Sequence, residues 1–173
     1  LQKEQLGTGH AVRMAEGKLK GFKGTVFVLF GDTPLIVPET LEQMATAVRT
    51  QKASVVVLGM RCIDPAAYGR LIVNKQGDLE RIVEFKDATA KERAVTLCNS
   101  GVMAIDGSLL FGWLKALKNN NASGEYYLTD IVALARKDKK RCVVVEAEEE
   151  QLLGVNDRVQ LAQAEALLQQ RLR

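Results

Sequence analysis

Residues 25–30 form an unbroken apolar run, TVFVLF, which ends at Gly31 and Asp32 and is followed by the turn-forming pair Thr33-Pro34. A continuous run rich in β-branched side chains is typical of a strand that is buried on both faces. Open α/β sheets bind ligands beyond the carboxyl ends of such strands, where a carboxylate can hold Mg²⁺ and leave positions open to water and phosphate. The alternative is that Asp32 only caps a turn, and these residues alone favour neither interpretation.

The length and charge of the chain indicate a single globular domain and argue against a nucleic-acid-binding protein. With 173 residues, of which 47% are hydrophobic and 26% charged, the chain can bury one substantial core, so we expect one domain. A net charge of +3 without a Lys/Arg cluster among aromatic residues argues against nucleic-acid binding. No apolar stretch is long enough to cross a membrane and the first residues have no signal-peptide pattern, so a cytoplasmic location is expected.

The three cysteines are Cys62, Cys98 and Cys142. They are odd in number, far apart and set in apolar segments, which fits neither a disulfide framework nor a zinc site. We expect them to be buried thiols.

Helical and strand patterns alternate in the first third of the chain. Residues 9–16 and 38–50 have helical patterns, whereas 25–31 and 54–60 read as buried strands. The strand-helix-strand spacing predicts that 25–31 and 54–60 form a parallel pair with a right-handed crossover.

The middle of the chain adds antiparallel structure. Residues 69–74 and 79–84 predict a β-hairpin with its turn around Gly77. Further strands are expected at 101–105 and 141–147, and further helices at about 109–117, 128–137 and from 157 onward. The predicted fold is α/β, with a Rossmann-like mixed, mostly parallel sheet flanked by helices and carrying an added hairpin.

Seven motifs in register over nearly the whole chain closely resemble one family, the uridylyltransferase domain of the bacterial bifunctional N-acetylglucosamine-1-phosphate uridylyltransferase/glucosamine-1-phosphate acetyltransferase. Each motif is weak alone, and together they are specific. They are the segments 2–11 (QKEQLGTGHA), 30–36 (FGDTPLI), 68–70 (YGR), 82–88 (IVEFKDA), 99–101 (NSG), 124–130 (GEYYLTD) and 154–158 (GVNDR).

The resemblance implies a nucleotide-diphospho-sugar transferase fold and a specific reaction. UTP and N-acetylglucosamine-1-phosphate would give UDP-N-acetylglucosamine and pyrophosphate, a step in bacterial cell-wall (peptidoglycan) synthesis. The attacking phosphate oxygen is already anionic, so catalysis would consist of positioning and charge neutralisation.

The resemblance also implies a metal site. Asp32 and Asn156 would hold the catalytic Mg²⁺, as hard oxygen ligands suited to an ion that bridges phosphates. An equally good local interpretation is that Asn156 caps the last helix, although Asp157 can do the same.

Substrate contacts follow in the same way. Gln2, Gly7 and Thr8 would meet the uracil and the rest of the nucleotide, because an amide matches the donor and acceptor edge of a pyrimidine and glycine admits close backbone approach. Phe30 and Gly31 would also line the substrate site.

Gly69, Glu84 and Asn99 would line the sugar pocket, where polar groups left unpaired would reject analogues. Taken alone, Glu84 would be an exposed charge at a strand end. The segment 125–130 is expected to close this pocket, unless Thr129 or Asp130 merely begins a helix. His10, the only histidine, is expected to be structural.

The chain departs from the family in two ways. Phe30 stands where the family usually has tyrosine, which puts substrate affinity in doubt. Nothing in the chain corresponds to the family's Gly-rich phosphate loop or its β-helix acetyltransferase domain, through which the whole enzyme would be a homo-oligomer. We therefore expect residues 1–173 to be a partial nucleotidyltransferase domain, with 69–98 as an insertion in the sugar half, and to be inactive alone. The alternatives are another sugar-nucleotide pyrophosphorylase and a non-catalytic sugar-nucleotide-binding module.

Overall fold

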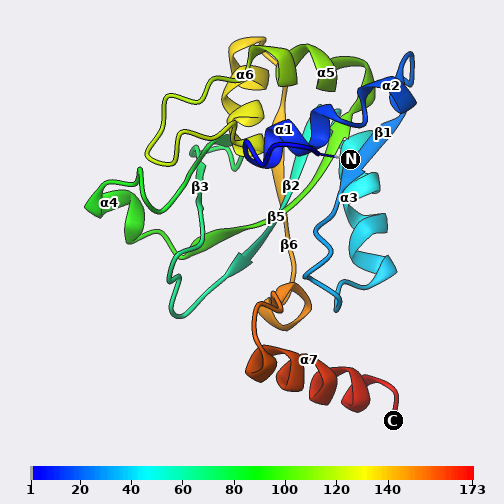
Figure 1. Cartoon of the computed structure of the whole chain (residues 1–173), viewed down its shortest axis with the longest axis vertical. Helices are drawn as coiled ribbons and strands as arrows, with labels where there is room; N and C mark the ends of the chain where they lie inside the picture. Colours follow the sequence, from blue (N-terminus) through cyan, green and yellow to red (C-terminus); the bar gives the residue numbers. More distant parts are fainter. Residues whose placement is uncertain (1) are drawn as a thin grey trace.

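The computed structural model describes residues 2–173 and shows a mixed β-sheet with helices on both faces (Figure 1). The strands are β1 (Thr25–Val28), β2 (Val55–Arg61), β3 (Arg70–Val73), β4 (Leu79–Val83), β5 (Leu97–Asp106) and β6 (Cys142–Glu146). The helices are α1 (Thr8–Arg13), α2 (Glu16–Leu19), α3 (Pro38–Thr50), α4 (Ala90–Arg93), α5 (Gly107–Ala116), α6 (Ile131–Lys137) and α7 (Arg158–Arg171), with 3₁₀ turns η1 (Leu128–Asp130) and η2 (Glu149–Leu152). The α/β class, the flanking helices and the hairpin are confirmed.

Strands that run in the same direction in this sheet are mostly not neighbours. β1, β2, β3 and β6 all run in one direction, because the first three are antiparallel to β5 and β6 is parallel to β2. Four of the six strands therefore share one direction and the sheet is mixed, as predicted, but of the five strand pairings within residues 2–173 only β2–β6 is parallel. The predicted direct pairing of 25–31 with 54–60 is wrong, since β5 lies between β1 and β2 and pairs antiparallel with both.

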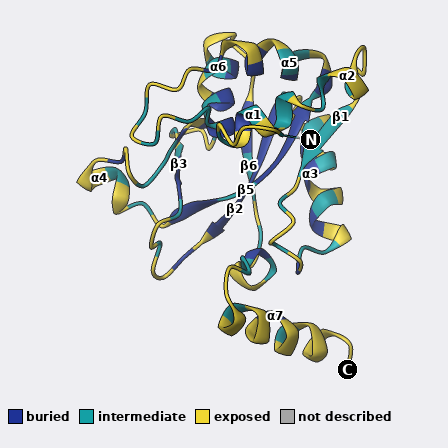
Figure 2. Ribbon diagram, viewed as in Figure 1, coloured by how far each residue is buried: buried dark blue, intermediate teal, exposed yellow. Residues whose placement is uncertain are grey.

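The alternation of side chains along β2 divides the core into two layers. Val55 and Val57 face the cluster that includes α5 and α6, whereas Val56 and Leu58 face the cluster built on Met44 of α3. Buried residues accordingly follow the sheet and the inner faces of these helices (Figure 2). The three cysteines are free and buried, as expected.

The hairpin β3–β4 is closed by a short polar turn. The side-chain Oδ1 of Asn74 accepts hydrogen bonds from the backbone N–H groups of Gln76 and Asp78, at 3.0 and 2.9 Å. Gly77 has φ of 84°, which favours glycine. The turn fixes the register, so the open end of the hairpin brings Gly69 next to Glu84.

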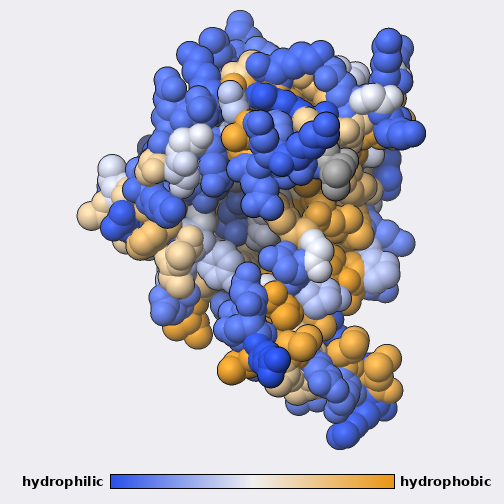
Figure 3. Space-filling model, viewed as in Figure 1, coloured by the Kyte–Doolittle hydropathy of each residue, from blue (hydrophilic) through white to orange (hydrophobic). Residues whose placement is uncertain are grey.

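α7 extends away from the rest of the molecule toward the C-terminus, and Figure 3 shows apolar atoms exposed along it. Ala164 is its only buried residue, and Val159 and Leu161 are mostly exposed. Arg171 ties it to the body by donating to the carbonyl of Leu35 at 2.6 Å. Over residues 2–173, every helix is too short or too polar to traverse a lipid bilayer.

β1 has one open edge, because within the described residues it pairs only with β5. Its residues are half-buried, and Leu29 just beyond it is 49% exposed. An apolar open edge is a template for pairing with another chain. We expect the 173-residue chain to self-associate as its concentration rises, and Leu29→Lys to reduce this association in sedimentation-velocity measurements.

Val159→Lys, which removes an exposed apolar residue from α7, is the matched control for that experiment. If Val159→Lys abolishes self-association and Leu29→Lys does not, the interacting surface is α7 rather than the edge of β1.

Candidate functional site

Three predicted site residues, Gly69, Glu84 and Asn99, meet at the open end of the hairpin. The backbone N–H of Asn99 donates to the carbonyl of Gly69 at 2.8 Å. A Cβ at position 69 would lie 3.3 Å from Oε2 of Glu84, so the absence of a side chain on Gly69 makes room for the carboxylate. Glu84 just after β4, Asn99 of β5 and Gly69 in the loop before β3 thus form one polar cluster.

Glu84 is mostly buried, and its surroundings shift its ionisation. Burial raises the pKa of the Glu84 carboxyl, and the nearby carboxylates of Asp130 and Asp87 raise it further. The hydroxyl of Thr129 donates to Oε1 of Glu84 at 3.0 Å and opposes this shift by favouring the charged form. Thr129 is 7% exposed and lies in the 3₁₀ turn Leu128–Asp130, so the segment 125–130 borders the cluster through Thr129, and its closure of a sugar pocket stays a prediction.

A bulge in β5 links Asn99 to Phe30. The register between β2 and β5 shifts near Gly59, and the side chain of Asn99 accepts a hydrogen bond from the backbone N–H of Gly101 at 3.0 Å. Gly101 has φ of 90°, and a Cβ there would lie 2.5 Å from Cε2 of Phe30. The ring of Phe30 therefore packs directly on the backbone of the bulge.

The loop after β1 lies beside the loop before α7. The backbone N–H of Val155 donates to the carbonyl of Asp32 at 2.8 Å, which places Asn156 next to the Asp32 segment. Asp157 caps α7 by accepting from the N–H of Gln160, so the helix cap is Asp157 and not Asn156.

The turn after Phe30 is closed without the side chain of Asp32. The hydroxyl of Thr33 donates to the carbonyl of Phe30 at 3.0 Å. The side chains of Asp32 and Asn156 have no hydrogen-bond partner anywhere in residues 2–173, and both residues are exposed. Both side chains are therefore available to a ligand.

The predicted nucleotide-side residues form a separate group near the N-terminus. Gln2, Gly7 and Thr8 line a pocket of about 310 Å³ together with Gln5, Ala11 and Glu125. Gln2 Nε2 lies 2.8 Å from Nδ1 of His10, which gives the histidine a structural contact. Gly7 has φ of 102° and lies against the backbone of Tyr126. Within residues 2–173, no hydrogen bond or ion pair joins this group to Asp32.

Arg70, in the motif at residues 68–70, has a structural role that the sequence did not predict. Although charged, it is 2% exposed, and its guanidinium donates to the backbone carbonyls of Pro65, Ala66, Tyr68 and Arg93. It therefore fixes the loop that carries Gly69. The sequence does place an arginine at the start of an apolar strand. A charge in such a position must be paired or hydrogen-bonded if it is buried, so this arginine could have been predicted to anchor the neighbouring backbone.

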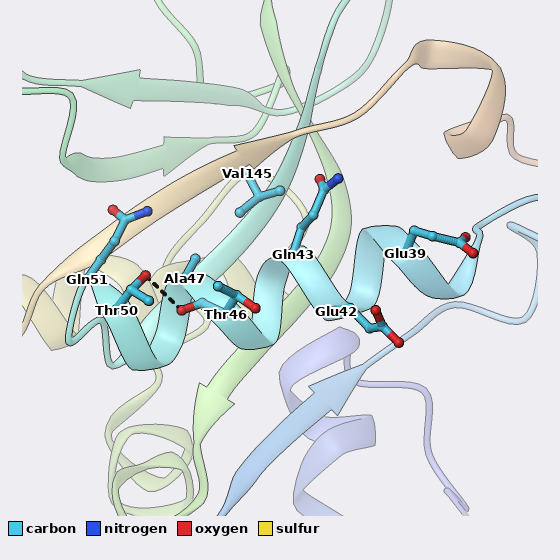
Figure 4. A pocket seen from close by; sticks show the side chains of 8 residues that line it. All are labelled: Glu39, Glu42, Gln43, Thr46, Ala47, Thr50, Gln51 and Val145. Carbon is cyan, nitrogen blue, oxygen red and sulfur yellow. Dashed lines mark hydrogen bonds between the residues drawn. The ribbon is translucent and has the colours of Figure 1, made fainter.

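The hollow along α3 contains none of the predicted site residues. A groove of about 530 Å³ runs along α3 beside Val145 (Figure 4). Its lining is made of helix-surface residues, and Thr50 bonds to the carbonyl of Thr46 at 2.9 Å. This groove gives no indication of chemistry.

A family model described as nucleotidyl transferase matches residues 1–154. The chain belongs to the nucleotidyl transferase family. Among curated relatives of this nucleotidyl transferase chain, the bifunctional protein GlmU of Rhodospirillum rubrum is 60% identical over the whole chain, which corresponds to 39% of that protein. GlmU of Roseobacter denitrificans is 54% identical over 99% of the chain and 38% of its own length. The chain thus spans about two fifths of these relatives, and the resemblance drawn from the motifs is confirmed.

Solved structures agree with the fold of a nucleotidyl transferase. Apo UDP-glucose pyrophosphorylase matches with a TM-score of 0.70 at 18% identity, over 98% of this chain and 63% of that one. UDP-glucose pyrophosphorylase in complex with UDP-glucose matches with a TM-score of 0.66 at 20% identity, over 84% of this chain and 55% of that one. At such low identity the likeness establishes the fold alone.

Proposed function

We propose that this chain provides the metal side and the sugar side of a uridylyltransferase that forms UDP-N-acetylglucosamine and pyrophosphate from UTP and N-acetylglucosamine-1-phosphate. The supporting observation is one continuous series of contacts, which runs from the Glu84–Gly69–Asn99 cluster through the Phe30–Gly101 contact to Asp32 and the Asn156 loop. A sugar 1-phosphate held at one end of this series would extend its phosphate toward the other end.

Asp32 and Asn156 suit Mg²⁺. They offer one carboxylate and one amide oxygen, on adjacent loops and without competing partners in residues 2–173, and Mg²⁺ prefers a few such oxygens with the remaining positions left to water and phosphate. When bound, Mg²⁺ would neutralise charge that develops on the phosphates.

On the sugar side, the side chains of Glu84 and Asn99 would orient the acetamido sugar by hydrogen bonds. The reaction forms a bond between the sugar-phosphate oxygen and the α-phosphorus of UTP, and the bond to pyrophosphate breaks. Because the attacking oxygen is anionic, the contribution of these residues is to hold it in line.

On the nucleotide side, the pocket lined by Gln2, Gly7 and Thr8 would receive uracil. Oε1 of Gln2 accepts no hydrogen bond from residues 2–173, and it can accept the N–H of a pyrimidine. Phe30 cannot supply the hydroxyl of the family's usual tyrosine, so its role is limited to packing on Gly101.

The activity is tested in a chimera, in which this chain replaces the matched 39% of the Rhodospirillum rubrum relative. With UTP and Mg²⁺, the chimera should release pyrophosphate with N-acetylglucosamine-1-phosphate and far less with glucose-1-phosphate. Preference for glucose-1-phosphate would indicate another pyrophosphorylase. If the chimera releases no pyrophosphate with either sugar phosphate but still binds the sugar nucleotide, the domain is a binding module.

We expect the 173-residue chain by itself to bind UTP poorly, because no Gly-rich phosphate loop is found in its sequence. Isothermal titration calorimetry with UTP and Mg²⁺ on a preparation of verified mass measures this, and the chimera is the positive control. Tight binding of UTP by the monodisperse chain would show that it contains its own triphosphate site.

A further inference from the structure

Thr129 occupies a well-anchored position between the two groups of site residues. The backbone N–H of its neighbour Leu128 donates to the hydroxyl oxygen of Thr8 at 3.0 Å. The N–H of Gly9 donates to the carbonyl of Tyr126 at 2.8 Å. The 3₁₀ turn that carries Thr129 is therefore held against the N-terminal segment. The hydroxyl of Thr129 donates to Glu84 on the other side of the turn.

Glu84 has few other groups that could hold its carboxylate. Within residues 2–173 it forms no ion pair, and Thr129 is the side chain that donates a hydrogen bond to it. The charged and titratable groups facing it are the carboxylates of Asp130 and Asp87, with Lys86 and Tyr127 lining the adjacent pocket of about 230 Å³. Lys86 is exposed and donates to the hydroxyl of Ser123 instead.

We propose that Thr129 is a positioning residue, whose hydroxyl holds one carboxylate oxygen of Glu84 so that the other stays directed to the hydroxyl groups of the sugar phosphate. The second oxygen, Oε2, is the one that lies over Gly69. The inference rests on the proposed function for its substrate, and its geometry stands independently of that function.

The first experiment needs no substrate. The pKa of Glu84 is measured by carbon-13 NMR of its side-chain carboxyl in the 173-residue chain, with Glu84→Gln to assign the signal. Loss of the Thr129 hydrogen bond removes a contact that favours the carboxylate, so Thr129→Val should raise the pKa of Glu84. Thr129→Ser should restore the original value.

Thr40→Val is the matched control. Thr40 is 4% exposed and its hydroxyl donates to Oε1 of Gln151 at 2.7 Å, so it loses a comparable buried hydrogen bond outside the candidate site. This variant should leave the pKa of Glu84 unchanged. Thr129→Ala replaces Thr129→Val if the latter does not fold. An unchanged pKa of Glu84 in the folded Thr129 variant would overturn the proposal.

The second experiment measures steady-state kinetics in the chimera. Because Thr129→Val no longer holds the carboxylate of Glu84 in place, it should raise KM for N-acetylglucosamine-1-phosphate roughly 10-fold or more. kcat and KM for UTP should change little, Thr129→Ser should restore KM, and the acid limb of kcat/KM should move to higher pH. An unchanged KM for the sugar phosphate would overturn the positioning role.

The two experiments separate the two hypotheses. If the unsubstituted chimera does not turn over any sugar phosphate, the proposed function is wrong, and the NMR titration still decides whether Thr129 holds Glu84. If the chimera is active and the Thr129 variants behave as the unsubstituted protein, only the inference about Thr129 is wrong.

Discussion

Asp32→Ala in the chimera is expected to lower kcat for UDP-N-acetylglucosamine formation by about 100-fold or more, the usual effect of removing a group that stabilises charge in the transition state. Asp32 is exposed, and its side chain makes no hydrogen bond within residues 2–173. The fold therefore does not depend on this carboxylate. Kinetics at several Mg²⁺ concentrations and a thermal unfolding curve measure the two effects separately.

Glu42→Ala, at an exposed carboxylate of α3, is the control for the loss of one negative charge, and it should retain full activity. Asn156→Ala should raise the Mg²⁺ concentration needed for half-maximal rate, because it removes the neutral oxygen of the pair. Activity of Asp32→Ala close to that of the unsubstituted chimera would contradict the assignment of Asp32 to the metal.

Gly101→Val is expected to lower the free energy of unfolding by about 3 kcal/mol, from a positive φ that costs about 1–2 kcal/mol and steric crowding that costs a similar amount. Gly101 has φ of 90°, and its position for a Cβ is already occupied by the ring of Phe30. For a protein of this size the unfolding midpoint should fall by about 6–12 °C in calorimetry.

Gly112→Ala is the matched control, because nothing lies within 4 Å of a Cβ at this exposed position in α5. It should stabilise the chain by about 0.5–1 kcal/mol through helix propensity. The double variant Gly101→Ala/Phe30→Ala removes the ring but keeps the unfavourable φ, so it separates the steric cost from the backbone cost. If Gly101→Ala alone is as stable as the unsubstituted chain, the contact with Phe30 imposes no constraint.

Local sequence patterns predicted a helix accurately where the apolar periodicity and the residues that start and end helices indicated the same bounds. The helix 38–50 is α3 to the residue, with Pro38 in its first turn and Met44 in its buried face. Its buried face also includes Thr40, which no apolar pattern indicates, because the hydroxyl is satisfied by Gln151 from a distant segment. The segment 9–16 was predicted as one helix and forms α1 and part of α2.

Strand neighbours could not be predicted from the same patterns. A buried run of β-branched residues shows that a strand has neighbours, and it carries no information on which strands those are. β5 inserts between β1 and β2 from far along the chain, which only tertiary packing determines.

The candidate site divides in a similar way. Motif resemblance identified Gly69, Glu84 and Asn99, and the structure brings them together. The choice between Asn156 and Asp157 as helix cap required coordinates, because both residue types cap equally well. The hydrogen bond of Thr129 to Glu84 joins residues 45 positions apart, so no local pattern could reveal it.

The sharing of one edge of β5 by two strands separates the hairpin from β1. β2 pairs along one edge of β5, while its other edge is shared by β3 at Cys98 and by β1 from Met103 onward, with the bulge at Gly101 between them. The hairpin is thus attached to a different stretch of β5 from the strand that leads to Asp32. The hairpin can therefore change in sequence without altering the β1–β5 register, and under the proposed function the sugar side could diverge while the metal side is retained.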